Sequence, residues 1–131
     1  QRIYQQKYIE KKDGILSTGN EADKLFMDKL TGILEKNIGN DEINVDNVAD
    51  LMGMSRSVYF KKLKSLTGLG PNDFLKGLRM QRAATLIDKG LYNNFDIAAM
   101  VGIGDAHYFS KCFKLYFGMT PTEWKKRKRD N

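Results

Sequence analysis

Apolar residues recur at helical spacing through most of this chain, and no stretch shows the strict alternation of apolar and polar residues that is typical of a strand. The first helical pattern begins near Ala22 and ends at Gly39-Asn40. Its recurring positions are Leu25, Phe26, Lys29, Leu30, Ile33 and Leu34. Residues 1–21 are polar and weakly periodic, so we predict that they form a linker or the tail of a preceding domain.

Glycine and serine positions predict a first helix-turn-helix at about 45–68. Its short first helix begins near Asp46, whose negative charge suits a helix N-terminus. Gly53 interrupts this helix, and Ser55 is a good N-cap for a second, longer helix over 56–67.

A long helix is predicted at about 71–90, because Pro71 is suited to the first turn of a helix. Its apolar residues are not confined to one stripe, which indicates burial on several sides. A second helix-turn-helix follows at about 94–118, and a C-terminal helix at about 120–129. The predicted fold class is all-α, with two helix-turn-helix subdomains joined by a long linker helix and about seven helices within 22–131.

The strongest feature of the sequence is an internal repeat. Val48–Gly53 matches Ile97–Gly102. Further along, Leu63-Lys64 matches Phe113-Lys114, and each pair is followed by a Gly-x-x-Pro segment, Gly68–Pro71 in the first copy and Gly118–Pro121 in the second. The offset between the copies grows by one residue between these blocks, so the second copy has one extra residue in or after its turn. Each copy reads as a short helix, a turn with glycine and a longer helix, which is the layout of a helix-turn-helix.

The longer helix of each copy has one apolar face and one polar face. The apolar faces consist of Tyr59, Leu63 and Leu66 in the first copy, and of Phe109, Phe113 and Tyr116 or Phe117 in the second. We predict that these side chains lie in the core and do not serve as a stacking platform for a ligand. The opposite faces are polar and carry no acid beyond the first turn. Such faces suit a polyanionic partner, and the formal net charge of +6 agrees with one.

Two such units joined by a long buried helix resemble the DNA-binding domain of the AraC/XylS family of bacterial transcription regulators. The resemblance covers about Leu25 to Arg129 and is best in the second copy, at Ile97–Gly102, Tyr108–Lys114 and Gly118–Pro121. The sequence departs from the family pattern at Gly104, where a polar residue is frequent, at His107, where Ser is usual, and at Lys111, where Arg is usual.

Met54–Ser57 together with Arg82–Ala84 is similar to the output domains of hybrid two-component regulators from Bacteroides-type gut bacteria. In those regulators a histidine kinase and a receiver precede the DNA-binding domain on one polypeptide. The resemblance therefore implies double-stranded DNA as the ligand, sensor and receiver domains on the same full-length chain, and RNA polymerase as a further partner of an activator. It also implies a cytoplasmic domain that makes no membrane contact.

The family positions imply two recognition helices that enter successive major grooves, which lie about 34 Å apart. The residues matched to base reading are Arg56, Ser57, Phe60 and Lys61 in the first helix, and Ala106, His107, Ser110 and Lys111 in the second. The residues expected to contact phosphates are Ser55, Lys64, Lys76, Arg79, Lys114 and Thr120. Three alternatives stay open. Phe60 is either exposed or buried, His107 contacts DNA or only solvent, and the basic run Lys125–Arg129 is a phosphate clamp or a solvated tail.

The two recognition helices differ in the chemistry they offer. Arg56 and Lys61 suit guanine O6 and N7, and Phe60 or Ala106 suits a thymine methyl group. The second helix has a less charged tip at Gly104–His107. We therefore expect the first helix to supply more of the sequence discrimination, and the second to act more through shape, Lys111 and phosphate anchoring.

Other classes of function find little support in the sequence. It contains no paired-carboxylate or Ser/His/Asp constellation, no phosphate-cradling glycine loop and no metal-ligand cluster, so we expect no enzyme and no cofactor. The single cysteine, Cys112, is expected to be a small buried residue. No apolar run approaches the roughly 20 residues needed to span a bilayer. The alternative function is a basic helical module that binds a protein or membrane surface without sequence-specific DNA recognition, but that function does not require twin repeats.

Overall fold

The computed structural model describes residues 20–129, and within that range every regular element is an α-helix. The seven helices are α2 (Glu21–Lys36), α3 (Val45–Met52), α4 (Arg56–Thr67), α5 (Pro71–Lys89), α6 (Asn94–Met100), α7 (Ala106–Phe117) and α8 (Pro121–Arg129). The all-α prediction is confirmed, and the predicted linker at 1–21 lies almost entirely outside the described residues.

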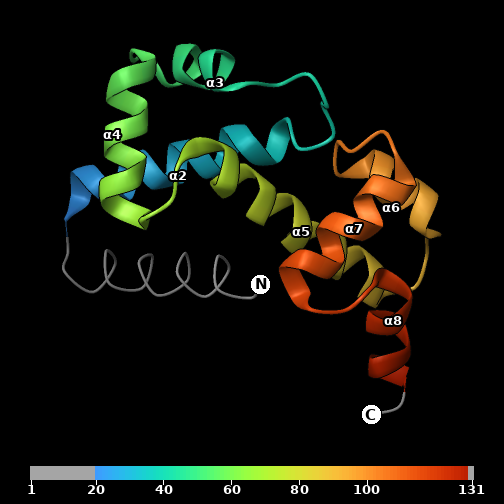
Figure 1. Cartoon of the computed structure of the whole chain (residues 1–131). Coiled ribbons are helices and arrows are strands. Elements are labelled where there is room, and N and C mark those ends of the chain that lie inside the picture. The colour runs from blue at the N-terminus through green and yellow to red at the C-terminus, as the bar shows by residue number, and fades with distance from the viewer. Residues whose placement is uncertain (1–19, 130–131) are drawn as a thin grey trace.

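The helices form two lobes that share α5 (Figure 1). The first lobe consists of α2, α3, α4 and the N-terminal half of α5, and its core includes Leu30, Leu63 and Phe74. The second lobe consists of the C-terminal half of α5 with α6, α7 and α8, and its core includes Met80 and Phe113. Because α5 contributes to both cores, its apolar residues have to face several directions, as the sequence pattern indicated.

Local signals in the sequence determine where the two longer helices begin. The Ser55 side chain accepts a hydrogen bond from the N–H of Val58 at 3.2 Å and caps α4. In the second lobe, the Asp105 carboxylate accepts from the N–H groups of His107 and Tyr108 at 2.8 and 3.2 Å and caps α7. Each cap satisfies backbone donors that have no partner within the helix.

The turns of the two helix-turn-helix units have the same backbone plan. Gly53 and Gly102 both adopt left-handed φ angles, 73° and 80°, which only glycine reaches without strain. One residue, Met54, separates Gly53 from the cap of α4, whereas Ile103 and Gly104 separate Gly102 from the cap of α7. The extra residue of the second copy therefore lies in its turn.

Aromatic packing fills the second lobe. The Phe113 ring lies 4.7 Å from Phe117 and 5.7 Å from Trp124 between ring centroids. The Trp124 indole N–H donates to a carboxylate oxygen of Asp88 at 2.9 Å, which fastens α8 to the end of α5. The prediction that Phe109, Phe113 and Tyr116 or Phe117 lie in the core is confirmed, since all four side chains are buried.

Two details of the first helix differ from the sequence pattern. Leu25 was counted on its apolar face, but it is 65% exposed, and Met27 is buried in its place. The helix also ends at Lys36 instead of near Gly39. Its C-cap is Asn37, whose side-chain amide donates to the carbonyl of Ile33 at 2.8 Å.

Candidate nucleic-acid interface

The outward face of α4 carries four of the side chains that the sequence matched to base reading. Arg56, Ser57 and Lys61 are exposed. The Arg56 guanidinium lies 3.5 Å from the Asp46 carboxylate, and both side chains remain largely exposed to solvent. Because exposed ion pairs contribute only about 0–1 kcal/mol, this contact leaves Arg56 free to exchange Asp46 for another acceptor.

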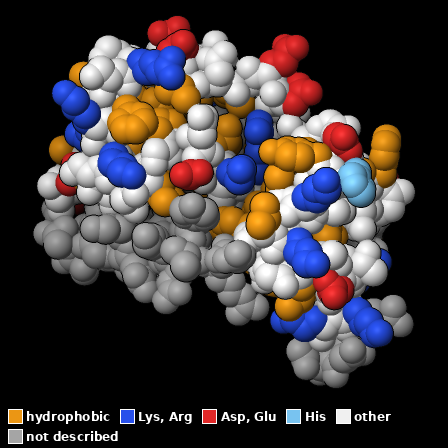
Figure 2. Space-filling model, in the orientation of Figure 1, with side chains coloured by type: hydrophobic (Ala, Val, Ile, Leu, Met, Phe, Trp, Pro, Cys, Tyr) orange, Lys and Arg blue, Asp and Glu red, His pale blue; other side chains and the backbone are white. Residues whose placement is uncertain are grey.

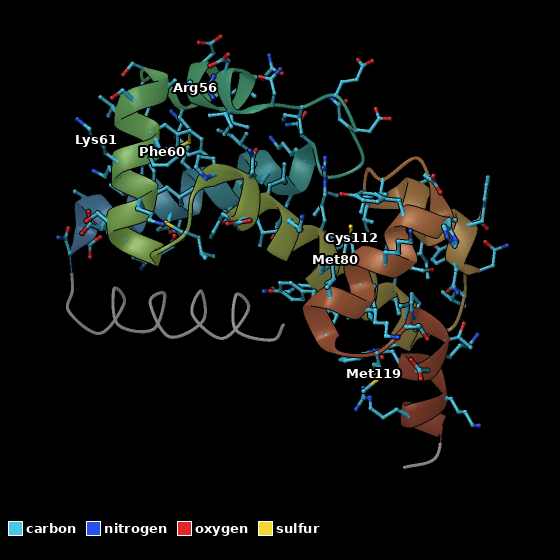
Figure 3. The ribbon with its side chains drawn as sticks, in the orientation of Figure 1. Arg56, Phe60, Lys61, Met80, Cys112 and Met119 are labelled. Carbon is cyan, nitrogen blue, oxygen red and sulfur yellow. The ribbon has the colours of Figure 1, made fainter. Side chains whose placement is uncertain are left out.

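Phe60 resolves an alternative that the sequence left open. Its side chain is 47% exposed, and one edge of the ring packs near Gly70, at the turn between α4 and α5. A methyl group at Gly70 would stand 3.6 Å from the ring. Figure 3 shows Arg56, Phe60 and Lys61 along α4. Phe60 is therefore an exposed aromatic ring supported from one side.

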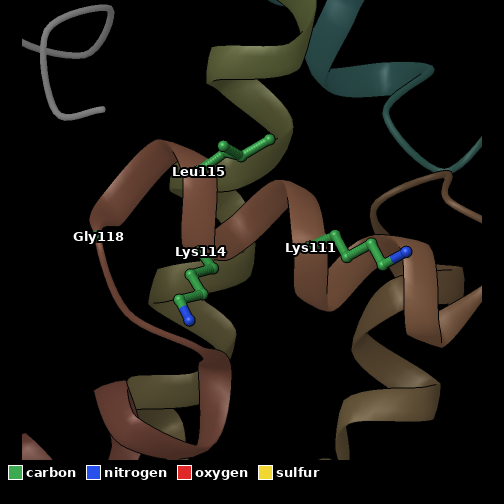
Figure 4. Close-up of a pocket in the computed structure, with 4 residues that line it drawn as sticks. All are labelled: Lys111, Lys114, Leu115 and Gly118. Atoms are coloured by element: carbon green, nitrogen blue, oxygen red, sulfur yellow. The ribbon is translucent and has the colours of Figure 1, made fainter.

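The corresponding face of α7 is less charged at its start. His107 and Lys111 are exposed, whereas Ala106 and Ser110 are half-buried, and Ala106 packs against the core of the second lobe. Lys111, Lys114, Leu115 and Gly118 line an open groove along the helix (Figure 4). The second recognition helix thus presents two lysines beside an apolar side chain, with small residues at its first turns.

The repeat places these two faces in register. Counted from their N-caps, Phe60 corresponds to Ser110, Lys61 to Lys111 and Lys64 to Lys114. The lysines are therefore common to both helices, whereas Arg56 and Phe60 have only Ala106 and Ser110 as counterparts. The two helices therefore differ in the side chains that they expose, as the sequence indicated.

The three lysines expected to contact phosphates, Lys64, Lys76 and Lys114, are all exposed. Lys76 lies on α5 between the two recognition helices and lines a cavity of about 190 Å³ where the lobes meet. Figure 2 shows Lys and Arg side chains over both lobes of the visible face, with Asp and Glu side chains scattered among them. This face therefore carries cationic side chains on both lobes.

Arg79, the other α5 residue expected to contact phosphate, has a different environment. Its side chain is half-buried, and its Nη2 donates to the backbone carbonyl of Asn40 at 2.8 Å. Burial lowers the pKa of the Arg79 guanidinium, and the charge of Asp41 opposes that shift. The guanidinium is committed to a contact within the protein, so the geometry favours a structural role over the predicted phosphate contact.

Thr120 is also engaged locally, in a capping box at the start of α8. The Thr120 N–H donates to the Glu123 carboxylate at 2.8 Å, and the Glu123 N–H donates to the Thr120 hydroxyl at 3.1 Å. Hydrogen bonds to the carboxylate from the Thr120 backbone, first, and from its side chain lower the pKa of the Glu123 carboxyl group. A carboxylate therefore already occupies this helix end, which disfavours the predicted phosphate contact at Thr120.

The basic run at the C-terminus divides into residues with different surroundings. Lys125 and Lys126 are exposed, whereas the Arg127 guanidinium stacks over the Trp124 ring at 4.1 Å from its centroid. Arg127 thus covers the aromatic cluster of its own lobe. The side chains of Lys128 and Arg129 lie outside the described part of the structure.

Tyr108 is an exposed residue that the sequence reasoning did not place among the DNA contacts. It lies in the first turn of α7, is 52% exposed and lines the cavity between the lobes together with Lys76. A hydrogen bond with the Cys112 thiol raises the pKa of the Tyr108 hydroxyl. Its position one residue before the buried Phe109 is the signal that could have indicated this exposure.

No group of three or more His, Cys, Asp or Glu side chains within residues 20–129 is arranged to hold a metal ion. None of the helices in the described range combines the length and apolar character required to cross a membrane.

The sequence and the fold both match known proteins. Residues 48–127 match the family described as a helix-turn-helix domain. Histidine kinase P4 of Formosa agariphila is 34% identical over 110 residues, which cover 84% of this chain and 8% of that protein.

Solved structures agree with this match. A DNA-binding transcriptional dual regulator from Escherichia coli K-12 superposes with a TM-score of 0.72 at 30% identity, covering 79% of this chain and 91% of that one. The C-terminal domain of the two-component response regulator yesN from Fusobacterium nucleatum gives a TM-score of 0.68 at 25% identity, covering 73% and 93%.

The fold and these likenesses define the class of protein, which is a DNA-binding domain of a transcription regulator with tandem helix-turn-helix units, and not an enzyme. Within that class, the chain belongs to the AraC/XylS family. It spans only a small part of some relatives, 8% of the Formosa kinase and 41% of the Msm operon regulatory protein of Streptococcus mutans.

Proposed function

We propose that this domain recognises a site of two unequal boxes in double-stranded DNA, with α4 in one major groove and α7 in the next. The observation that supports this most directly is the register of the two helices. Each presents an exposed face with lysines at corresponding positions, and one shared helix, α5, connects the two lobes. A two-box site follows because successive major grooves on one side of a duplex are about 34 Å apart.

Each helix has residues suited to base edges. On α4, the Arg56 guanidinium and the Lys61 ammonium suit guanine O6 and N7, the Phe60 ring suits a thymine methyl group, and Ser57 lies on the same exposed side. On α7, His107 and Lys111 are the exposed donors, with the half-buried Ala106 and Ser110 beside them.

The phosphate backbone has its own set of contacts in this proposal. Lys64, Lys76 and Lys114 are exposed and neutralise phosphates, and the capped N-terminus of α4 at Ser55 adds backbone donors. These contacts position the domain and provide affinity without reading sequence.

The full-length protein is proposed to be a signalling regulator with this domain as its output. The similarity to a histidine kinase and to the C-terminal domain of a response regulator supports sensor and receiver domains on the same polypeptide. Relatives that are named transcriptional activators support activation, with RNA polymerase as the partner. A domain that acts on bacterial chromosomal DNA in this way works in the cytoplasm.

The decisive experiment is selection of bound sequences from a random DNA pool, followed by binding measurements on the selected duplex. We expect enrichment of two boxes about one helical turn apart. Arg56→Ala and Lys111→Ala should each weaken binding to the selected site by about fivefold or more, since a good contact to a base contributes about 1–3 kcal/mol.

Lys24→Ala, which removes an exposed lysine that belongs to α2 and to neither recognition helix, is the matched control and should bind like the wild type. A pool that shows no enrichment, together with equal affinity of all three variants for any duplex, would sink the proposal. It would favour the alternative of a basic interaction module.

A further inference from the structure

The turns of the two helix-turn-helix units share one hydrogen-bond pattern. In the first, the Gly53 N–H donates to the carbonyl of Asp50 at 3.0 Å, and in the second the Gly102 N–H donates to the carbonyl of Ala99 at 3.1 Å. Both glycines have left-handed φ angles. At these glycines the two turns are therefore locally equivalent.

Their surroundings are different. A methyl group added at Gly53 would meet no atom of the described chain within 4 Å. A methyl group added at Gly102 would collide with the backbone carbonyl oxygen of Ile38 and stand 2.9 Å from the Nη2 of Arg79. The second turn is therefore packed directly against the loop that joins α2 to α3, and the first turn is free of such a contact.

That loop belongs to the first lobe but extends to the second (Figure 1). At its start, Gly39 lies so close to α6 that an added methyl group would stand 3.2 Å from the carbonyl oxygen of Met100. Glycines from opposite lobes thus allow two stretches of backbone to approach each other without intervening side chains.

Arg79 fastens the loop to the linker helix at the same place. From the middle of α5 its Nη2 donates to the Asn40 carbonyl at 2.8 Å, and its charge attracts the Asp41 carboxylate on the same loop. The Arg79 Nη2 also lies close to the Gly102 turn. One half-buried guanidinium on the shared helix therefore contacts both the loop of the first lobe and the turn of the second lobe.

We infer that this group, residues 38–41 with Arg79 and Gly102, is an interlobe latch that sets the distance and angle between α4 and α7. It thereby determines which spacing between two DNA boxes the domain accepts. A single helix between two lobes leaves them able to bend and twist about it. A second attachment beside that helix removes this freedom. The effect on the accepted spacing between DNA boxes rests on the proposed function, whereas the contact between the lobes does not.

DNA geometry makes the spacing a sensitive measure of the latch. A duplex advances about 34 Å in about 10 base pairs, so one inserted base pair moves the second box by about 3.4 Å and rotates it by about 36°. If the two recognition helices are held rigidly, they cannot both stay in their boxes after this displacement, and affinity falls. Without the latch, the second helix can move with its box, and little affinity is lost.

The main experiment compares Gly102→Ala with Gly53→Ala in the full chain. Both substitutions place a Cβ in a left-handed turn, but only Gly102→Ala displaces the loop. Binding is measured to the selected two-box duplex, to duplexes with one base pair inserted or removed between the boxes, and to a duplex with the first box alone.

We expect the wild type and Gly53→Ala to prefer the selected spacing by about tenfold or more, equal to the roughly 1.4 kcal/mol that a tenfold ratio represents. Gly102→Ala should prefer it by less than about threefold and bind the first box alone as the wild type does. A spacing preference in Gly102→Ala equal to that of Gly53→Ala would overturn the inference.

Arg79→Met gives a second test that introduces no steric clash, in case Gly102→Ala does not fold. A positioning role predicts that the preference for the selected spacing falls, and Arg79→Lys restores part of it. A direct phosphate contact predicts instead equal weakening at every spacing and a shallower salt dependence. Equal weakening would overturn the role of Arg79 in the latch.

A measurement without DNA separates this inference from the proposed function. Nitroxide labels are attached after Ser65→Cys on α4 and Phe95→Cys on α6, two exposed positions in opposite lobes, in a Cys112→Ala background. Double electron–electron resonance measures the distance between the two labels. The distribution of this distance should be narrow for the wild type and Gly53→Ala, and broader for Gly102→Ala and Arg79→Met. Unchanged distributions overturn the latch. Broadened distributions in a protein that binds no two-box DNA support the latch and overturn the proposed function.

Discussion

At the scale of single residues, side chains with the same sequence signature have different environments. Lys76 and Arg79 lie about one turn apart on α5, and the sequence predicts the same phosphate-contacting role for both. Lys76 is exposed, however, whereas Arg79 is half-buried against Asn40. Phe60 is the reverse case, because it is an apolar residue on the surface, supported by Gly70. The sequence identified the residue types correctly, but burial depends on which loop lies opposite, and that is a property of the folded chain.

The Phe60 ring leads to a prediction about one atom group in DNA. Replacing each thymine of the first box in turn by uracil removes only the C5-methyl group. At one position we expect this to weaken wild-type binding about threefold to fivefold, since burying one methyl group contributes about 0.8 kcal/mol. Fluorescence anisotropy titrations on the selected duplex provide the measurement.

The matched variant for this test is Phe60→Ala, which should bind thymine and uracil duplexes equally well. A Lys61→Ala variant keeps the ring and should keep the sensitivity to the methyl group. If Phe60→Ala discriminates thymine from uracil as well as the wild type does, the ring does not contact the methyl group.

At the scale of elements, the helices themselves were largely predictable. Ser55, Pro71 and the repeated glycines mark helix ends chemically, so α4 and α5 begin and end within a residue of the prediction. The repeat also predicted which face of each recognition helix is buried. The contact between the loop 38–41 and Gly102 was not predictable, because it joins segments far apart in the sequence and relies on glycines that leave no side-chain pattern. Thr120 is a different case, because its capping partner Glu123 is only three residues away and the Thr-x-x-Glu pattern of a capping box can be read in the sequence.

The buried tyrosines of the two recognition helices predict a response to alkaline pH. Burial raises the pKa of Tyr59 on α4 and of Tyr116 on α7 to about 12, from about 10. Because the folded state keeps these hydroxyls neutral, their contribution to stability is complete below pH 10 and is lost as pH rises from about 10 to about 12. Urea denaturation midpoints measured across this range should fall.

Tyr59→Phe and Tyr116→Phe should each flatten that fall, because phenylalanine has no proton to lose. Tyr92→Phe, at an exposed tyrosine, is the control and should leave the pH profile as it is. A profile that stays steep in the double variant Tyr59→Phe with Tyr116→Phe would assign the alkaline loss of stability to other groups.

The unequal tips of α4 and α7 predict unequal boxes. Arg56 and Phe60 have no chemical counterpart on α7, where Ala106 and Ser110 are half-buried. We therefore expect single base-pair changes in the box read by α4 to cost about 1–3 kcal/mol each, and changes in the box read by α7 to cost less. Scanning every base pair of the selected duplex by competition binding measures both. Greater sensitivity in the box of α7 would reverse the assignment.

At the scale of the whole molecule, two small cores act as one recognition unit because α5 runs through both and the latch joins them a second time. The charge that attracts DNA is spread over both lobes (Figure 2). In the proposed complex, affinity from phosphates and discrimination from bases are therefore carried by different residues. The first depends on exposed lysines across the molecule, and the second on two short helix faces held in a fixed relation.

This separation predicts how affinity depends on salt. The logarithm of the binding constant falls linearly with the logarithm of salt concentration, with a slope of about −0.9 for each phosphate neutralised. Lys64→Ala, Lys76→Ala and Lys114→Ala should each make the slope shallower by about 1 and weaken binding to selected and random duplexes alike. Arg79→Met should leave the slope unchanged, because its guanidinium is bonded to Asn40 in the protein. Isotherms between about 50 and 200 mM salt test both statements together. A shallower slope for Arg79→Met would show that Arg79 contacts a phosphate. Unchanged slopes for all three lysine variants would show that Lys64, Lys76 and Lys114 do not contact the DNA.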